Sequence, residues 1–449
     1  MTAPLVSPHR IAARYAPDVD DNFNPSAIRV GYLAGRYPAL SHPLMFREIA
    51  ALRKAGIIVE VSSINHIYGR SAALPEDESA ELCRVFCIRK VSVAQLLAAC
   101  LRTVVRRPKT VAHALRLSLR HAFAGGGQYL RWAAWLSDAI ILGDWLAQRH
   151  IGHLHAHFAT EVSNVGYLAA KIFDIDFSMT VDGPDEIYDA NNNLLNRQIE
   201  TAALLCCTSM FTRSQLMKFA SPDEWYKIRV VRFGVDPAEF NPQPFRIKPD
   251  VFEILCVGRL VPAKGQHVLL EAVAALSRQG YKIRLRLVGD GPDRGSLERH
   301  CVSLGLTGCV EFEGAVHKDR IGGFVQKADL FVLASFAEGL PVVLMEAMAS
   351  EVACVSTAVA GIPELIRDGI NGLLVPSSDQ SALEKAIARL IEDPSLRRRL
   401  GRAGRARLVE QFEIHWNVTL LRKLFHECIP CHRTNRAPHE RRAVISAHV

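Results

Sequence analysis

Two basic residues in the second half of the chain have types and spacing suited to a phosphorylated ligand. Arg259 and Lys264 lie in a short segment between an apolar, strand-like run and a helix-like run. Two fixed cations in such a loop suit a diphosphate, because arginine offers a planar fork of donors and lysine a point charge. Taken alone, the pair is equally compatible with a solvated loop that binds nothing.

A second group, FAEGLPVVLMEAMAS, contains Glu338 and Glu346 with seven residues between them. Pro341 fits the first position of a helix, so Glu338 and Gly339 would lie in the loop before it. The main-chain N–H groups of Gly339 and Leu340 would then be unpaired at the positive end of that helix, which suits an anion. We interpret Glu338 as a ligand for sugar hydroxyls and Glu346 as a ligand for a ribose diol. The alternative is that Glu338 caps the helix and Glu346 faces water.

Three histidines in the first half, His153, His155 and His157, alternate along one strand-like run and therefore share a face. They could resemble a metal site, but no carboxylate or cysteine stands at ligand spacing, so no metal is expected. Asp174 and Asp176 form a D-x-D pattern, which we interpret as chance.

The elements that must position these residues alternate between strand and helix in two series separated by a proline-rich seam. This pattern predicts an α/β protein with two doubly wound, Rossmann-like domains. Ligands of such sheets bind at the carboxyl ends of the strands, so we expect the site between the domains. The expected organisation is a disordered leader (1–26), an N-terminal domain (27–236) with a basic helical insertion (88–137), a linker (237–250), a C-terminal domain (251–412), a helix returning to the N-terminal domain (413–428) and a flexible tail (429–449).

Length and composition agree with two cores. The chain has 449 residues, of which 49% are hydrophobic and 22% charged, which excludes global disorder. No apolar run approaches the roughly 18 to 20 residues that span a bilayer, and the first 25 residues show no secretory signal. The 11 cysteines mostly lie in apolar segments and are interpreted as reduced. Cys428, Cys431 and His432 match a haem c attachment pattern, which we interpret as coincidence. A cytoplasmic protein is expected.

The basic charge is concentrated in one segment. Between Arg89 and Ser137 there are nine lysines and arginines and no aspartate or glutamate, whereas the whole chain carries a net charge of +8. Apolar residues recur between the basic ones at helical spacing. We expect this segment to dock on the anionic surface of the inner membrane, peripherally and on its cytoplasmic face. A solvated basic face is the main alternative, and no nucleic-acid recognition motif is present.

The motifs GRLVPAKG, LVGDGP, EGLPVVLMEAMAS and AGIPELIRDGINGLLVP, in that order, resemble the retaining glycosyltransferases of family 4, which have the GT-B fold. The resemblance extends over roughly residues 27–425 and is closest to bacterial exopolysaccharide and colanic-acid-type enzymes. Several linked motifs at consistent spacing are more specific than a single glycine pattern.

The resemblance implies roles for individual residues. Catalytic roles fall on Arg259 and Lys264, which would neutralise the donor diphosphate, on Glu338 near the transferred sugar, and on His157 of an HxHF-like element. Glu346 matches the ribose-binding glutamate, and the remaining donor-binding positions are Gly258, Gly339, Leu340 and Pro341. The segment Arg36–Glu48 is similar to the acceptor-side loop and helix of bacterial exopolysaccharide enzymes in this family. The acceptor side would therefore include Ser41 of this segment, together with Asp182 and Gly183. Asp182 departs from the family, which often has histidine there.

The function implied is that of a retaining hexosyltransferase. It would move a hexose from a nucleotide-diphosphate sugar to a glycan or polyprenyl-linked acceptor in bacterial polysaccharide biosynthesis. Neither a cofactor nor a metal is required if side-chain cations stabilise the leaving diphosphate. The alternatives are a non-catalytic nucleotide-sugar-binding subunit of a synthesis complex and a GT-B nucleotide-sugar epimerase.

Overall fold

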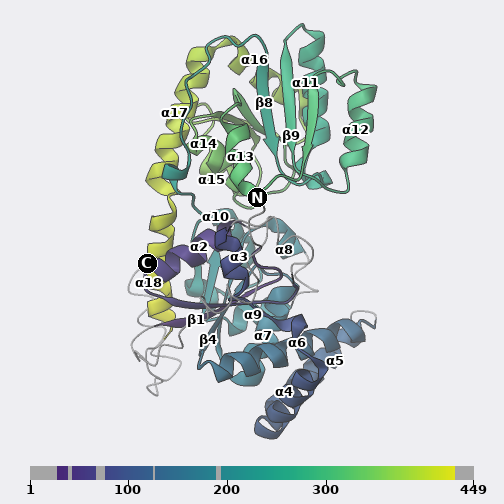
Figure 1. Ribbon diagram of the computed structural model, residues 1–449, viewed down its shortest axis with the longest axis vertical. Coiled ribbons are helices and arrows are strands. Elements are labelled where there is room, and N and C mark those ends of the chain that lie inside the picture. Colours follow the sequence, from purple (N-terminus) through teal and green to yellow (C-terminus); the bar gives the residue numbers. More distant parts are fainter. Residues whose placement is uncertain (1–27, 39–42, 67–75, 125–126, 189–193, 430–449) are drawn as a thin grey trace, which may run out of the picture. The chain divides into compact units, whose positions relative to one another are not determined.

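The computed structural model describes residues 28–38, 43–66, 76–124, 127–188 and 194–429 (Figure 1). By their contacts the residues form two compact units. The N-terminal unit comprises residues 1–180, 191–205 and 422–449, and the C-terminal unit comprises residues 181–190 and 206–421. Each unit is described by itself below.

The first sheet has seven strands in the order β3-β2-β1-β4-β5-β6-β7. Its strands are β1 (Arg29–Ala34), β2 (Ile58–Ser63), β3 (Phe86–Cys87), β4 (His153–His157), β5 (Asp176–Val181), β6 (Leu204–Cys207) and β7 (Ile228–Val230). Strand β1 pairs in parallel with both β2 and β4, so the strand order reverses between β1 and β4. The sequence did not indicate the two-residue strand β3, which is too short to show a pattern.

Helices of the first half of the chain connect these strands. They are α2 (Pro43–Lys54), α3 (Glu76–Leu82), α4 (Val93–Arg106), α5 (Pro108–Ala124), α6 (Tyr129–Gln148), α7 (Glu161–Phe173), α8 (Pro184–Tyr188), α9 (Leu195–Thr201) and α10 (Met210–Met217). Helix α7 packs on β4, α6 packs on α7, and α4 and α5 pack on α6 (Figure 1). The helices α4 and α5 therefore form an outer layer of the N-terminal unit and are separated from the sheet by α6 and α7.

The second sheet has six strands in the order β10-β9-β8-β11-β12-β13. These are β8 (Phe252–Val257), β9 (Ile283–Val288), β10 (Val310–Gly314), β11 (Leu330–Leu333), β12 (Ala353–Thr357) and β13 (Leu373–Val375). The expectation of a doubly wound sheet in this domain is confirmed. All pairings among them are parallel, and the order reverses between β8 and β11.

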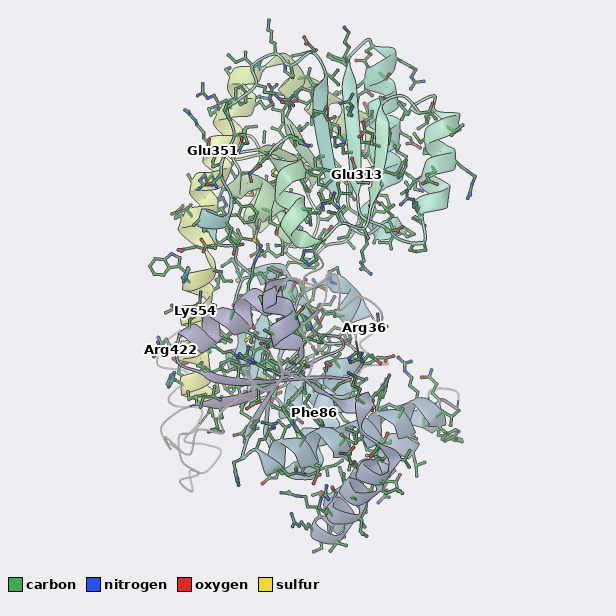
Figure 2. The ribbon with its side chains drawn as sticks, viewed as in Figure 1. Arg36, Lys54, Phe86, Glu313, Glu351 and Arg422 are labelled. Atoms are coloured by element: carbon green, nitrogen blue, oxygen red, sulfur yellow. The ribbon has the colours of Figure 1, made fainter. Side chains whose placement is uncertain are left out.

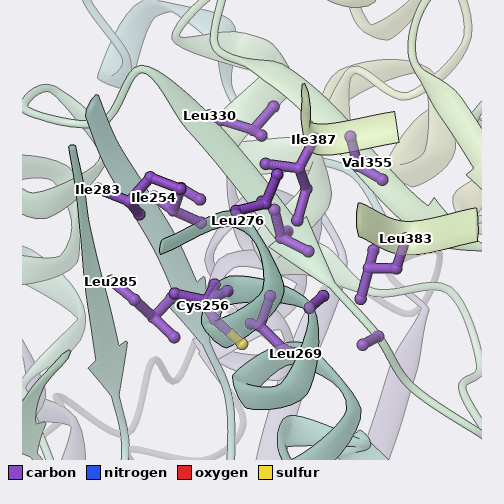
Figure 3. Packing of buried hydrophobic residues seen from close by; sticks show 14 of the residues in the cluster. Ile254, Cys256, Leu269, Leu276, Ile283, Leu285, Leu330, Val355, Leu383 and Ile387 are labelled. Atoms are coloured by element: carbon purple, nitrogen blue, oxygen red, sulfur yellow. The ribbon is translucent and has the colours of Figure 1, made fainter. Parts of the chain in front are cut away.

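The second sheet is covered by α11 (Gln266–Arg278), α12 (Arg294–Ser303), α13 (Lys318–Val325), α14 (Val342–Ala349), α15 (Ile362–Leu365), α16 (Gln380–Glu392) and α17 (Pro394–Gln411). Figure 3 shows one face of its core, where Ile254 and Cys256 of β8 and Leu285 of β9 meet Leu269 and Leu276 of α11. These side chains are at most 2% exposed. Burying an aliphatic side chain of this size contributes about 1.5–3 kcal/mol, so this layer holds the strand ends in place.

The segment before β8, which includes Arg246 and Ile247, is held against the rest of the C-terminal unit by hydrogen bonds from Arg397. Arg397 is 1% exposed, and its guanidinium donates to the carbonyls of Arg246 and Ile247. A surface cavity of about 230 Å³ beside these residues is also lined by Arg398 and Arg402. It includes none of the residues with expected roles in the chemistry, and we attribute its basic lining to the fastening of this segment.

The last helix, α18 (Ile414–Cys428), contributes residues to both units, and it begins one residue after the expected 413. In the N-terminal unit Phe425 is fully buried and meets the rings of Tyr32, His153 and His155 edge-on. Among the described residues, no helix is long and apolar enough to cross a membrane.

Candidate active site

The loops after β8 and β11 meet because these strands are neighbours at the point where the strand order of the second sheet reverses. The backbone N–H of Phe336 donates to the carbonyl of Ala263 over 2.8 Å. Gly265 has a φ of +62°, and a Cβ there would lie 2.1 Å from the carbonyl oxygen of Ala334. Only glycine allows this approach, which explains the glycine of the GRLVPAKG motif in structural terms.

The two loops bring together Lys264, which is partly exposed, and Glu338, which is buried, as an ion pair. Lys264 Nζ lies 2.6 Å from Glu338 Oε1, and Ser335 Oγ donates to the same oxygen over 2.6 Å. Glu338 is 7% exposed. Its carboxylate therefore does not cap α14, which begins at Val342 with Pro341 at the N-cap and no side-chain cap. The sequence placed the start of this helix at Pro341, one residue too early.

The main-chain turn after Glu338 packs against Asp182 within the C-terminal unit. The carboxylate of Asp182 accepts a hydrogen bond from Thr208 Oγ1 over 2.7 Å, and the backbone N–H of Leu340 donates to it over 3.5 Å. The expectation that the N–H of Leu340 is unpaired was therefore wrong. A Cβ on Gly339 would lie 2.5 Å from Asp182 Oδ1, so glycine is required at this contact.

Burial raises the pKa of Asp182 to about 6, and the bonds from Thr208 and Leu340 oppose this rise. Glu338 raises this pKa further, and Lys264 lowers it. A carboxyl group that titrates in this range sits where the resembled family often has histidine. The adjacent Gly183 and the backbone of Asp182 itself donate to Glu186 Oε1 over 3.4 and 3.1 Å, which fixes the loop after β5.

Arg259 is exposed at the end of β8, one residue after Gly258. Its guanidinium makes no hydrogen bond or ion pair with any residue that the structure describes. The loop around it is tight, since a Cβ on Gly289 would lie 1.9 Å from the carbonyl oxygen of Gly258, and one on Gly291 would lie 2.2 Å from that of Leu260. The glycines of LVGDGP thus hold the backbone that carries Arg259.

Glu346 is 5% exposed within α14. The alternative that Glu346 faces water was therefore wrong. That Glu346 binds the ribose of the donor nucleotide remains a prediction.

In the N-terminal unit, His157 is the last residue of β4 and lies beside Glu48 of α2. His157 Nε2 is 3.8 Å from Glu48 Oε1, and Tyr32 donates its hydroxyl proton to the same oxygen over 2.9 Å. Burial raises the pKa of Glu48 to about 7, and the Tyr32 hydrogen bond opposes this rise. The pair lies at the strand-order reversal of the first sheet, next to β1.

The other two histidines of β4 bond hydroxyls on the neighbouring strand. His153 Nε2 lies 2.6 Å from Ser178 Oγ, and His155 lies 2.8 Å from Ser178 Oγ and 2.9 Å from Thr180 Oγ1. Burial lowers the pKa of His153 to about 3 and also lowers that of His155, so both are neutral at pH 7. Within the described ranges, no group of three or more His, Cys, Asp or Glu side chains is arranged to hold a metal ion.

Several expectations lie outside the described residues: the leader (1–26), Ser41, Cys431 and His432. Three residues that the structure adds to the picture were given no role from the sequence. They are Ser335, Tyr32 and Glu48, of which only Glu48 lies in a segment that the sequence singled out, Arg36–Glu48. Tyr32 and Glu48 are 16 positions apart, and no periodic signal links them.

Residues 237–407 match the family model described as glycosyl transferases group 1. The putative colanic acid biosynthesis glycosyltransferase WcaL of Escherichia coli (strain K12) is 33% identical over 245 residues, which are 52% of this chain and 60% of that protein. The chain spans 53 to 60% of the length of the first curated relatives it matches.

Solved structures resemble a larger share of the chain. Sucrose-phosphate synthase from Thermosynechococcus elongatus has a TM-score of 0.69 at 19% identity and covers 89% of this chain and 98% of its own. Anabaena HepE in complex with UDP-glucose has a TM-score of 0.67 at 19% identity and covers 88% and 98%. The fold over most of the chain is therefore that of the GT-B glycosyltransferases, and residues 237–407 match glycosyl transferases group 1.

Proposed function

We propose that this protein transfers a sugar from a nucleotide-diphosphate sugar to a glycan or lipid-linked acceptor in bacterial polysaccharide biosynthesis. The observation that carries the proposal is the meeting of Lys264, Glu338 and the Gly339–Leu340 turn, because all of them lie within the segment that matches the group 1 model. The names of the relatives support the biosynthetic setting, and the HepE complex supports a nucleotide sugar as donor.

The donor diphosphate is proposed to bind at the loops after β8 and β11. Arg259 supplies an exposed guanidinium, and Lys264 supplies a second cation that is paired with Glu338 in the structure. In this proposal Lys264 turns from the carboxylate to the diphosphate when the donor binds, and Glu338 becomes available for a sugar hydroxyl. Such fixed charges stabilise a leaving diphosphate because they need no reorganisation during the reaction.

Three finer points belong to the same proposal. The sugar is a hexose, and its anomeric configuration is kept, as the resemblance to family 4 implies. No metal is required, because Arg259 and Lys264 take over the stabilisation of charge. His157 accepts the proton of the acceptor hydroxyl, and Glu48, 3.8 Å away, positions its ring and raises its basicity.

The test is release of nucleoside diphosphate from a panel of UDP-, GDP- and ADP-hexoses by the purified protein, with and without membrane extract as acceptor. Lys264→Ala and Glu338→Ala are expected to lower turnover by at least about 100-fold. Lys282→Ala is the matched control, because Lys282 is an exposed lysine of the same unit. Binding of a donor without any turnover, or unchanged rates in both variants, would refute the assignment.

The stereochemistry is tested on the product. The anomeric coupling in its proton NMR spectrum, read before mutarotation, is expected to match that of the donor. The inverted configuration would contradict the retaining mechanism and leave the donor site itself unaffected.

A further inference from the structure

Large hydrophobic side chains that are exposed to solvent gather on the outer helices of the N-terminal unit. Of the 18 such side chains among the described residues, ten lie between Val93 and Leu130. Single exposed apolar residues are common on protein surfaces, but a contiguous group marks an interaction site. We therefore interpret this group as an interaction surface.

On α4 the exposed apolar side chains form one stripe. Val93, Leu97 and Leu101 follow each other at intervals of four residues, and the stripe continues at Val104 and Val105. Their exposed fractions range from 47 to 72%. The residues that α4 buries, Ala99 and Thr103 among them, lie on another side, which packs on α6.

On α5 an apolar stripe runs beside a basic one. Leu115, Leu119 and Phe123 are 46, 51 and 78% exposed and repeat every four residues. At about 100° per residue these three cover a sector of roughly 80°, and Lys109, Arg116 and Arg120 fall within roughly the next 60°. The α5 residues that are buried, Ala114, Ser118 and Ala122, lie on the remaining side.

The basic residues of the insertion are not all equally available to a partner. Arg89, Arg102 and Arg131 are bonded to Asp138, Asp144 and Glu161 at 3.0, 2.5 and 2.5 Å and so tie the insertion to α6 and α7. By contrast, Lys109, Arg116 and Arg120 are exposed and form no ion pair within the described part of the chain. No acidic residue lies on α4 or α5 to neutralise them.

We propose that the exposed side chains of α4 and α5, here called the α4–α5 face, dock on a membrane that contains anionic phospholipids. The face consists of Val93, Leu97, Leu101, Val104, Val105, Leu115, Leu119, Phe123, Lys109, Arg116 and Arg120. The apolar stripes enter the interfacial region while the basic side chains bind the anionic headgroups, which is the arrangement of a helix that lies in a membrane surface. Charge decides against a second copy of the chain as partner, because the face of that copy would carry the same positive charge.

The inference does not depend on the proposed sugar transfer. It concerns a different part of the molecule, and a vesicle-binding measurement needs neither donor nor acceptor. Failure of one proposal therefore leaves the other standing.

Vesicle flotation of the full chain tests the basic stripe. Binding is expected to vesicles of phosphatidylglycerol and phosphatidylcholine and to fall steeply with added salt, whereas phosphatidylcholine alone binds little. The variant Lys109→Gln/Arg116→Gln/Arg120→Gln is expected to bind the anionic vesicles about 100-fold more weakly. The control Arg278→Gln/Arg299→Gln/Lys385→Gln removes the same charge from exposed residues of the C-terminal unit and is expected to bind like the unmodified chain.

The apolar stripe is tested separately. Leu115→Asn/Leu119→Asn/Phe123→Asn is expected to weaken binding at least about tenfold while the thermal unfolding of the chain stays unchanged, because these side chains are exposed. Lipids brominated on their acyl chains are expected to quench tryptophan fluorescence more strongly in a Phe123→Trp variant than in the unmodified chain.

The proposal would be overturned by equal binding of the two charge variants, by the absence of quenching at position 123 in a vesicle-bound protein, or by no vesicle binding at all. If the unmodified chain instead forms a dimer that the asparagine variant dissolves, the face is an interface between copies and the proposal is wrong.

Discussion

Replacing Glu338 with glutamine is expected to strengthen the binding of a nucleoside diphosphate and at the same time to slow sugar transfer. In the structure, Glu338 Oε1 lies 2.6 Å from Lys264 Nζ, so a diphosphate must compete with this carboxylate for the lysine. Glutamine keeps the shape and the contact with Ser335 but removes the charge. A hydrogen bond to a charged group contributes about 1.5–3 kcal/mol. Because Lys264 remains partly exposed, we expect about half of this free energy to be recovered in binding, which corresponds to a Kd that is lower by about 3- to 12-fold.

The assay is isothermal titration of whichever of UDP, GDP and ADP binds, at low and constant salt. Lys264→Met is expected to raise the Kd by about 10- to 100-fold. Ser335→Ala is the matched control, because it removes the other contact to the same oxygen over 2.6 Å without freeing a charge, and its Kd is expected to stay within about twofold. Turnover falls in both charge variants. If Glu338→Gln weakens binding as Lys264→Met does, the competition between carboxylate and diphosphate is refuted.

Gly265→Ala is expected to lower the free energy of unfolding of the C-terminal unit by about 2–4 kcal/mol, measured by urea unfolding. The reason is that φ is +62° and the new Cβ would lie 2.1 Å from the carbonyl oxygen of Ala334. An unchanged urea midpoint would contradict the close contact of the two loops. Asp182 has a folded-state pKa of about 6 against the usual 3.8, so the folded protein holds a proton that the unfolded chain releases. Its contribution to the free energy of unfolding is therefore present below about pH 4 and lost as the pH rises through 6, and Asp182→Asn is expected to flatten the unfolding profile in this range. Glu48 has a pKa of about 7, and we propose that its ionised form positions His157, so kcat/KM is expected to rise as the pH increases through 7. In Glu48→Gln this rise is expected to disappear, and an identical pH profile in the variant would exclude the role.

Much of the fold followed from local patterns in the sequence. The strands of the second sheet are short runs rich in apolar residues, and such runs alternate with helix-like segments, which is enough to predict a parallel sheet. The same logic placed Lys264 and Glu338 at the carboxyl ends of strands. Neighbouring strands β8 and β11 then bring these ends together, although 74 residues separate the two side chains.

The sequence could not predict which polar groups pair. The contact of Asp182 with the N–H of Leu340 joins residues 158 positions apart, and no spacing rule applies at that separation. For the same reason the Lys264–Glu338 ion pair was not expected, since both residues were assigned to a ligand. The short strand β3 was missed because an element of two residues shows no alternation of side chains. Its Phe86, labelled in Figure 2, stacks on Trp145 with ring centroids 4.8 Å apart.

The basic insertion shows the same division. Its helical periodicity and its excess of positive charge were visible in the residue types alone. The pairing of Arg102 with Asp144, 42 residues away, was not, so the sequence overestimated the charge available to a partner. Burial in three dimensions separates the arginines that hold the helices together from those that remain exposed.

A crystal structure of the chain with a bound nucleoside diphosphate is the most direct test of the central claim. We predict pyrophosphate oxygens within hydrogen-bonding distance of Lys264 Nζ and the Arg259 guanidinium, with the Lys264–Glu338 ion pair opened. A nucleotide bound away from the loops after β8 and β11, or a pyrophosphate that leaves this ion pair intact, would contradict the account.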